Sequence, residues 1–375
     1  MLVIILIITV LYLFLIGSLI YGFDKVQPFK LEDITPKTKF SVVIPFRNEA
    51  ENLPILIESI STLNYPKSMF EIIFVDDEST DDSAEKINKN SFDIKSIDIS
   101  VIKNKRTSKS PKKDAITSAI NSAKYDWIVT TDADCLLPKY WLDVFDGYIQ
   151  KNSPNLLVAP ISFGTVSSFF ERFQLLDILS LQGASIGGFG IKKPFLCNGA
   201  NLAYRKDFFK DINGFEGNAH IASGDDIFLL EKAVKHDINK VKYIKSEQVI
   251  VQTNPESNFK SLKSQRVRWA AKTSSYKNLF GKFTGLVVLL MNALLVCLPV
   301  LYLLQIVNLK TVIYIVFIKF LIDFLLVFKT ARYFGQEHYL SSYLFSSLLY
   351  PFFSVYIAFI SMFKGYKWKG RTHTK

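Results

Sequence analysis

The chain has 375 residues, 49% of them hydrophobic, which is enough apolar material for the core of one large domain or two smaller ones. The net charge is +11, but Lys and Arg are dispersed and form no helix-turn-helix, zinc-finger or RNP pattern. We therefore expect membrane lipids and anionic ligands as partners, and no nucleic acid. Cys135, Cys197 and Cys297 form no C-x-x-C pair, which argues against zinc or redox motifs and fits a reducing compartment.

The first predicted element is a membrane anchor. Residues 2–23 contain no charged side chain and, at about 1.5 Å per residue in a helix, can cross a hydrocarbon layer of about 30 Å. A cleaved signal peptide is the alternative. However, only Met1 precedes the apolar run, and no small-x-small cleavage site follows it before Asp24. We predict an uncleaved transmembrane anchor.

After a linker, short apolar runs rich in β-branched residues alternate with amphipathic segments, which is the pattern of βαβ units. Runs that are apolar on both faces are typical of parallel strands covered by helices. The predicted strands are 40–45, 71–75, 97–102, 127–131 and 156–163, and the predicted helices are 49–63, 83–90, 114–124 and 167–181.

Acidic side chains cluster where two of these strands end. One strand runs into Asp76 and Asp77, and another runs into Asp132 and Asp134. Ligands of open α/β sheets bind beyond the carboxyl ends of the strands. Carboxylates at neighbouring strand ends repel one another unless they share a cation or a hydrogen-bonding ligand. The pattern predicts a metal ion and a polar ligand at this edge.

Four motifs in a fixed order carry a family resemblance. They are the paired loops VIPFRNE (43–49) and VDDESTD (75–81), TDAD (131–134), NGANLAYR (198–205) leading to GDD (224–226), and QRVRW (265–269). Over about 40–276 the chain resembles glycosyltransferase family 2. The resemblance implies an α/β GT-A fold and inverting transfer from a nucleotide sugar, with a UDP-linked donor expected.

The first two loops are similar to the "P-x-R-N-E" and "V-D-D-x-S-x-D" loops of that family. The resemblance implies that Pro45, Arg47, Glu49, Asp76 and Asp77 bind the base and ribose of the donor. Carboxylates can accept hydrogen bonds from base N–H groups and ribose hydroxyls, and a proline fixes the turn. Taken alone, each loop is equally an acidic turn that caps a helix.

The third motif resembles the D-x-D of the family, and it implies that Asp132 and Asp134 bind a divalent cation, Mg²⁺ or Mn²⁺, with Asp132 also contacting the donor. Two carboxylates one residue apart at a strand end can both reach a hard cation. Such a cation stabilises the charge that develops on the leaving diphosphate.

A basic segment, PKKDAI at 111–116, occupies the place of the family's "G-K-x-x-A-L" but lacks its glycine. Lys112 is the matching contact to the base or a phosphate of the donor. Lys113 is the alternative for this role, and a solvated basic loop is the interpretation without function.

The acidic pair Asp225 and Asp226 resembles the "E-D" or "D-D" pair of the family. The resemblance implies that Asp226 is the general base that takes the proton of the acceptor hydroxyl, and that Asp225 binds substrate. A helix N-cap is the alternative, more for Asp225 than for Asp226. His220 is a contact to phosphate or metal, or a structural histidine.

The fourth motif matches Q-x-x-R-W, which in this family accompanies polysaccharide synthases and ceramide-type lipid glucosylating enzymes. Gln265, Arg268 and Trp269 share one helix face and offer a hydrogen-bond donor, a cation for diphosphate and a stacking platform for a sugar. An amphipathic helix at the membrane surface is the alternative.

Three apolar stretches near the C-terminus predict further membrane segments: 283–307, 311–328 and 339–363. The middle one carries Lys319 and Asp323 on one helix face, which is either a structural ion pair or a polar lining. The glycine-rich stretch 183–190 is predicted to be a flexible loop over the active site. The expected organisation is an anchor at 1–23, a linker at 24–37, a GT-A domain at 38–282, transmembrane segments within 283–363 and a basic tail at 364–375.

Nucleotide sugars are cytosolic, so the resemblance implies a multi-pass protein of the cell membrane with a cytosolic catalytic domain. The lysines that follow the first span agree with the positive-inside rule. Three further crossings would place the basic tail outside. We expect the last stretch, divided by Pro351, to be bent or re-entrant and to return the tail to the cytosol.

The leading functional hypothesis is the addition of sugars to a growing polysaccharide at the cytosolic membrane face. Non-processive glycosylation of a membrane lipid is the alternative. Four spans are few for a polymer channel, which favours a partner subunit for export or a lipid acceptor. A non-catalytic subunit that binds a nucleotide sugar is the hypothesis from another class.

Overall fold

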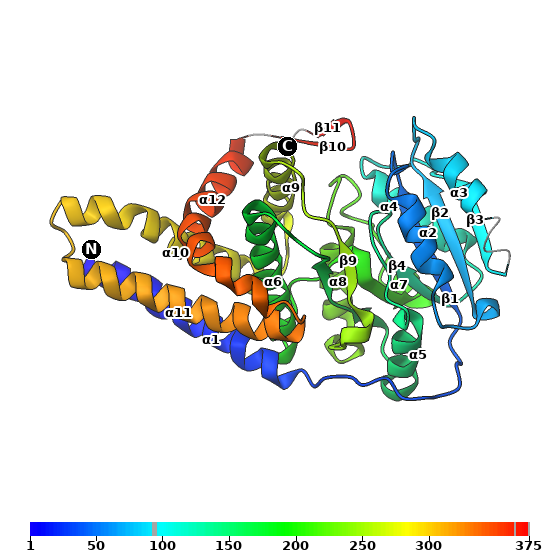
Figure 1. Cartoon of the computed structure of the whole chain (residues 1–375), viewed down its shortest axis with the longest axis horizontal. Helices are drawn as coiled ribbons and strands as arrows, with labels where there is room; N and C mark the ends of the chain where they lie inside the picture. Colours follow the sequence, from blue (N-terminus) through cyan, green and yellow to red (C-terminus); the bar gives the residue numbers. More distant parts are fainter. Residues whose placement is uncertain (92–95, 364, 374–375) are drawn as a thin grey trace. The chain divides into compact units, whose positions relative to one another are not determined.

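The computed structural model describes residues 1–91, 96–363 and 365–373, and it divides into two compact units (Figure 1). The membrane-helix unit comprises Met1–Val26, Thr165–Leu196 and Pro255–Lys375, and the sheet unit comprises Gln27–Gly164 and Cys197–Asn254. This division differs from the predicted 38–282 domain. Residues 165–196 and 255–282 belong with the apolar helices, because the helices they form pack on those segments.

The sheet unit is built on a seven-stranded sheet with the order β3-β2-β1-β4-β7-β5-β8. β1 pairs in parallel with β2 and β4, and β2 with β3, whereas β7 is antiparallel to both of its neighbours. β1 and β2 are buried almost throughout, as expected of parallel strands covered on both faces. The strands are β1 (Phe40–Phe46), β2 (Phe70–Asp76), β3 (Asp98–Lys103), β4 (Trp127–Thr130), β5 (Leu156–Val158), β7 (Leu202–Arg205) and β8 (Val241–Tyr243).

Helices connect these strands, and the predicted α/β fold is confirmed. They are α2 (Leu53–Ser61), α3 (Ser83–Ser91), α4 (Pro111–Ser122), α5 (Trp141–Asn152), α7 (Lys206–Asp211) and α8 (Asp225–Asp237). The predicted strand 156–163 is two strands, because Pro160 follows β5 and has no N–H for the ladder. The second piece, β6 (Ile161–Phe163), pairs instead with β9 (Val251–Thr253) in a small separate sheet.

The membrane-helix unit contains the predicted apolar helices. Within the part of the chain that the structure describes, four helical segments are long and apolar enough to cross a membrane, judged by length and composition: Leu2–Lys25, Leu279–Leu303, Leu309–Tyr333 and Glu337–Phe363. The unit consists of α1 (Leu2–Lys25), α6 (Phe169–Gly190), α9 (Phe259–Ala271), α10 (Leu279–Leu303), α11 (Leu309–Tyr333), α12 (Tyr343–Phe363) and the short strands β10 (Tyr366–Trp368) and β11 (Arg371–His373).

The glycine-rich stretch 183–190 is helical, so the predicted flexible loop is wrong. It forms the last two turns of α6, which pack against α1. A Cβ atom on Gly187 would lie 2.2 Å from the backbone oxygen of Leu19, and one on Gly190 would lie 1.8 Å from that of Gly22. The glycines therefore allow two helix backbones to touch, as small residues do between membrane helices.

Lys319 and Asp323 form an ion pair within α11, and a hydrogen bond from Tyr12 joins this pair to α1. The Lys319 Nζ atom lies 2.6 Å from Oδ2 of Asp323, and the Tyr12 hydroxyl donates a hydrogen bond of 2.6 Å to Oδ1. Lys319 is only 5% exposed. Because both carboxylate oxygens are engaged by neighbouring side chains, the geometry favours the structural ion pair over a polar lining.

The last apolar stretch forms one helix. α12 continues through Pro351, so the two predicted halves are parts of a single element. In Figure 1 the red, C-terminal part of α12 runs at a steep angle to α10 and α11. Large apolar side chains are exposed along α12, while two serines, Ser346 and Ser361, are buried.

The contact between α1 and α6 predicts a strong asymmetry between two glycines. Gly187→Ala should destabilise the protein by about 3 kcal/mol, because the new Cβ atom overlaps the α1 backbone. Gly17→Ala is the matched control on α1, where a Cβ atom meets no described atom within 4 Å and helix propensity slightly favours alanine. Thermal unfolding of both variants in the same detergent tests this, and equal melting temperatures would contradict the packing role of Gly187.

Candidate active site

Two loops lie side by side at the carboxyl edge of the sheet, because Phe46 is in register with Asp76 where β1 and β2 end. The Asp77 N–H donates to the Phe46 carbonyl oxygen over 2.9 Å, and the Thr80 N–H donates to Asn48 Oδ1 over 2.8 Å. Asn48 adopts a left-handed φ of 53°, which asparagine tolerates better than most residues. The loops thus form one cross-linked edge.

Arg47 fastens the second loop to the first. Its Nη1 atom donates to the backbone carbonyl oxygens of Asp77 and Glu78 over 2.6 and 2.5 Å, respectively. Pro45 lies within β1, opposite Val75 on β2. Arg47 therefore shapes the acidic loop in this structure through backbone contacts.

Asp77 is 6% exposed and is held by two residues that the motifs did not identify. Asn104 Nδ2 donates to Asp77 Oδ1 over 2.7 Å, and Arg106 Nη1 lies 3.7 Å from the same oxygen. Arg106 also lies 3.7 Å from Asp114 on α4. In the sequence, Arg106 is one of several basic residues that follow the predicted strand 97–102, so nothing distinguished it from its neighbours.

Asp76 and Glu49 hold the turns around them. Asp76 Oδ1 accepts a hydrogen bond of 2.8 Å from the Ser79 N–H. Glu49 is buried and accepts from Asn52 Nδ2 over 2.7 Å, while its own N–H donates to Ser83 Oγ over 2.9 Å.

Lys112 connects two of the predicted acidic groups. Its Nζ atom lies 2.6 Å from Asp132 Oδ1 and 3.2 Å from Asp225 Oδ2. Burial opposes the charged form, but the two carboxylates outweigh it and raise the pKa of Lys112 above its ordinary value. Pro111 begins α4 in place of the family's glycine, and Lys112 follows in the first turn. A fixed positive charge therefore lies between the D-x-D and the acidic pair.

Lys113 points elsewhere. It is 1% exposed, and its Nζ atom donates to the carbonyl oxygens of Asn218 and Ile221 over 2.8 and 3.0 Å. The ammonium also lies 4.8 Å from the centre of the Phe228 ring on α8. Lys113 thus anchors the loop that precedes α8, and Lys112 is the lysine that faces the acids.

Asp225 and Asp226 occupy the first turn of α8, after Gly224 with a φ of 83°. Asp226 Oδ1 accepts a hydrogen bond of 2.7 Å from the Ile227 N–H. A Cβ atom on Gly199 would lie 2.8 Å from Asp225 Oδ2, so the glycine leaves room for this carboxylate. His220 is exposed in the preceding loop.

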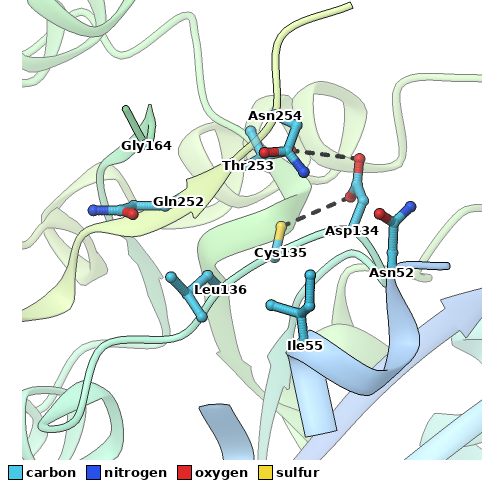
Figure 2. A pocket seen from close by; sticks show the side chains of 9 residues that line it. All are labelled: Asn52, Ile55, Asp134, Cys135, Leu136, Gly164, Gln252, Thr253 and Asn254. Carbon is cyan, nitrogen blue, oxygen red and sulfur yellow. Dashed lines mark hydrogen bonds between the residues drawn. The ribbon is translucent and has the colours of Figure 1, made fainter. Parts of the chain in front are cut away.

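Asp134 faces an open pocket with a cavity volume of about 110 Å³ (Figure 2). Thr253 Oγ1 donates to Asp134 Oδ2 over 3.4 Å, and the Cys135 thiol donates to Oδ1 over 3.9 Å. Burial raises the pKa of Cys135, and Asp134 raises it further, so the thiol remains protonated. The lining is rich in amide side chains: Asn52, Ile55, Asp134, Cys135, Leu136, Gly164, Gln252, Thr253 and Asn254.

The carboxylates suit a divalent cation that also has ligands from substrate. Among the described residues, no group of three or more His, Cys, Asp or Glu side chains forms a complete metal cage. Mg²⁺ typically takes one or two carboxylates and completes its shell with phosphate oxygens and water. Asp132 and Asp134 can supply that donor set.

The Q-x-x-R-W residues lie on α9, in the membrane-helix unit. Gln265 Nε2 donates to Glu256 Oε1 over 2.8 Å. The Trp269 ring lies 4.2 Å from the guanidinium carbon of Arg266, a residue between the motif positions. Gln265, Arg268 and Trp269 are all partly exposed.

The α/β sheet, with acidic loops at the carboxyl edge of its parallel strands, is consistent with the GT-A fold of glycosyltransferases. The sequence model of glycosyl transferase family 2 matches 41–212, and that of glycosyl transferase family group 2 matches 127–362. The second match covers more than half of the chain. The chain belongs to glycosyl transferase family group 2.

Similar proteins are found among archaea and bacteria. "Glycosyltransferase AglE" of Haloferax volcanii is 24% identical over 198 residues, which cover 52% of this chain and 60% of that protein. "Undecaprenyl-phosphate 4-deoxy-4-formamido-L-arabinose transferase" of Yersinia enterocolitica is 40% identical over 104 residues, which cover 27% of this chain and 30% of that protein. The matches thus span less than two thirds of either relative.

A solved structure supports the fold over nearly the whole chain. It is "Mannosyltransferase PcManGT from Pyrobaculum calidifontis in complex with GDP-Man and Mn2+". The TM-score is 0.55 at 15% identity, and the match covers 91% of this chain and 99% of that one.

Proposed function

We propose that the protein transfers a sugar, with inversion, from a nucleotide sugar to an acceptor at the cytosolic face of the membrane. The contact of Lys112 with both Asp132 and Asp225 carries this proposal. The carboxylates can bind a cation and sugar hydroxyls, and the ammonium group of Lys112 can bind a diphosphate. These groups lie at the edge of the sheet where ligands of α/β proteins bind. UDP is the expected nucleotide.

The donor nucleotide lies along the cross-linked loops in this proposal. Asp76 and Glu49 contact the ribose and base, beside Pro45 near the end of β1, while Arg47 and Asp77 keep the acidic loop in place. The hydrogen bonds between the loops support this role, since a pre-formed edge does not have to be ordered by the ligand.

Asp226 is the proposed general base. Its carboxylate takes the proton from the acceptor hydroxyl while that oxygen attacks the anomeric carbon and the bond to the diphosphate breaks. Attack from the face opposite the leaving group inverts the anomeric centre. The position of Asp226 in the first turn of α8 supports the role, because Lys113 and Gly224 fix the loop before it.

Asp132 and Asp134 would hold Mg²⁺ or Mn²⁺. When bound, such a cation would neutralise the charge that develops on the leaving diphosphate. The structurally similar mannosyltransferase was solved with GDP-Man and Mn²⁺, which supports a divalent cation of this kind.

A membrane lipid is the acceptor that the relatives favour, since several of them are named undecaprenyl-phosphate transferases. A growing polysaccharide is the second candidate, favoured by the Q-x-x-R-W sequence at 265–269. In either case Gln265, Arg268 and Trp269 are the proposed substrate contacts on α9. A polymer would require a partner subunit for export.

We further propose that α1, α10 and α11 cross the membrane and that α12 returns along its surface. Tyr12 of α1 bonds Asp323 of α11, and farther along both helices Asp24 pairs with Lys329 over 2.8 Å, so these two helices run in the same direction. The chain after α11 is thus on the side of the catalytic domain. The apolar exposed side of α12 and its steep course in Figure 1 support a helix at the interface.

Cysteine labelling tests this topology. Lys369→Cys and Gln305→Cys are made separately in a Cys297→Ser background, because Cys297 is exposed. A membrane-impermeant maleimide on intact cells should label position 305, between α10 and α11, and should leave position 369 unlabelled until the cells are lysed. Labelling of position 369 in intact cells would place the tail outside and reject the topology.

The transfer reaction is tested with membranes that contain the protein and a panel of radiolabelled nucleotide sugars. We expect one organic-soluble product, reduced about 100-fold or more in Asp226→Asn because a general base is lost. Asp211→Asn, at the exposed end of α7, is the matched control and should retain activity.

A ladder of products would identify a polymer acceptor instead of a lipid. If cellular glycan is unchanged in Asp226→Asn but is lost on deletion of the whole protein, the chain acts as a non-catalytic subunit, and the proposal is rejected.

A further inference from the structure

A buried polar network joins α6 and α9 around Arg266, which none of the assigned roles uses. Arg266 is 6% exposed, and so is Asp177 on α6. Arg266 Nε donates to Asp177 Oδ2 over 2.8 Å, and Nη2 lies 2.8 Å from the same oxygen. The guanidinium is therefore fixed by an acid from another helix.

The same guanidinium contacts two of the motif residues. Nη1 donates to Oε1 of Gln265, and the group stacks on the Trp269 ring at 4.2 Å. Arg266 thus touches the residue before it and the one a helical turn after it. A planar guanidinium can pair with a carboxylate along one edge while its face covers an aromatic ring.

A second anchor holds the other end of the Gln265 amide. Gln265 Nε2 donates to Glu256 Oε1 over 2.8 Å. Gln174 on α6, fully buried, pairs with the Glu256 backbone by two hydrogen bonds of 2.9 and 3.0 Å. Gln174 and Asp177 lie three residues apart on α6 and thus on one face, so α6 fixes both ends of the amide.

We infer that Arg266 is a positioning residue: anchored by Asp177, it holds the Gln265 amide and the Trp269 ring in the orientation that binds the acceptor. A buried ion pair adds little net stability compared with a well-packed apolar pair, so stability alone does not account for the pair of Arg266 and Asp177. A held side chain loses less freedom when a ligand binds. The inference rests on the proposed contact of Gln265 and Trp269 with substrate.

The test separates folding from positioning. Asp177→Leu with Arg266→Met replaces the ion pair by apolar groups, so the protein should melt near the wild-type temperature. With the total polar-lipid extract of the producing cells titrated as acceptor at saturating nucleotide sugar, the apparent KM for acceptor should rise roughly tenfold. UDP affinity should not change, and Lys260→Met, an exposed change on α9, should match the wild type.

Arg266→Lys covers the case in which the double variant does not fold. It keeps a cation beside Asp177 but lacks the planar group for Gln265 and Trp269, so the acceptor KM should again rise roughly tenfold in a folded protein. In a Trp269→Ala background, Arg266→Lys should raise the acceptor KM by a much smaller factor than it does in the wild-type protein, because the two residues act together.

Two results overturn the inference and are distinguishable. If Trp269→Ala raises the acceptor KM but both Arg266 variants fold and leave it unchanged, positioning by Arg266 is wrong and the proposed substrate contact stands. If Trp269→Ala also has no effect, the substrate contact proposed for α9 fails together with the inference.

Discussion

The structure depends on one electrostatic constraint: several carboxylates meet at the carboxyl edge of a parallel sheet, and a cation must lie among them. Lys112 meets this need by contacting Asp132 and Asp225 together. Its position follows from Pro111, which begins α4 at that edge, and from Gly199, which leaves space beside Asp225. A nucleotide sugar with its divalent cation brings both signs of charge to the same place, which is why this edge suits donor binding.

A second constraint acts in the membrane-helix unit, where apolar surroundings make every unpaired polar group expensive. The unit answers with contacts between helices that are distant in sequence. Backbones touch at Gly187, the Tyr12 hydroxyl on α1 donates to Asp323 on α11, and Arg266 on α9 pairs with Asp177 on α6. The last contact links the geometry of the Q-x-x-R-W residues to α6, so the substrate contacts proposed for α9 depend on a helix outside the motif.

Local patterns identified the parallel strands, the apolar helices and the acids that meet at the sheet edge, because strand periodicity and strand-end motifs are encoded within a few residues. The features that local patterns did not predict depend on contacts between residues that are far apart in the sequence. The stretch 183–190 resembles a loop because glycine disfavours helices, yet packing on α1, more than 160 residues earlier, makes it helical. Arg266 was missed for a similar reason, since its partner Asp177 lies 89 residues away.

The central claim is that the edge around Lys112 binds the diphosphate of the donor. Calorimetric titration of the purified protein with UDP and Mn²⁺ tests it most directly, with Lys112→Met compared with Lys109→Met, an exposed lysine of the preceding loop. We expect Lys112→Met to weaken UDP binding at least about tenfold, or about 1.4 kcal/mol, while Lys109→Met binds as the wild type does. Equal UDP affinity in a folded Lys112→Met variant would contradict the account.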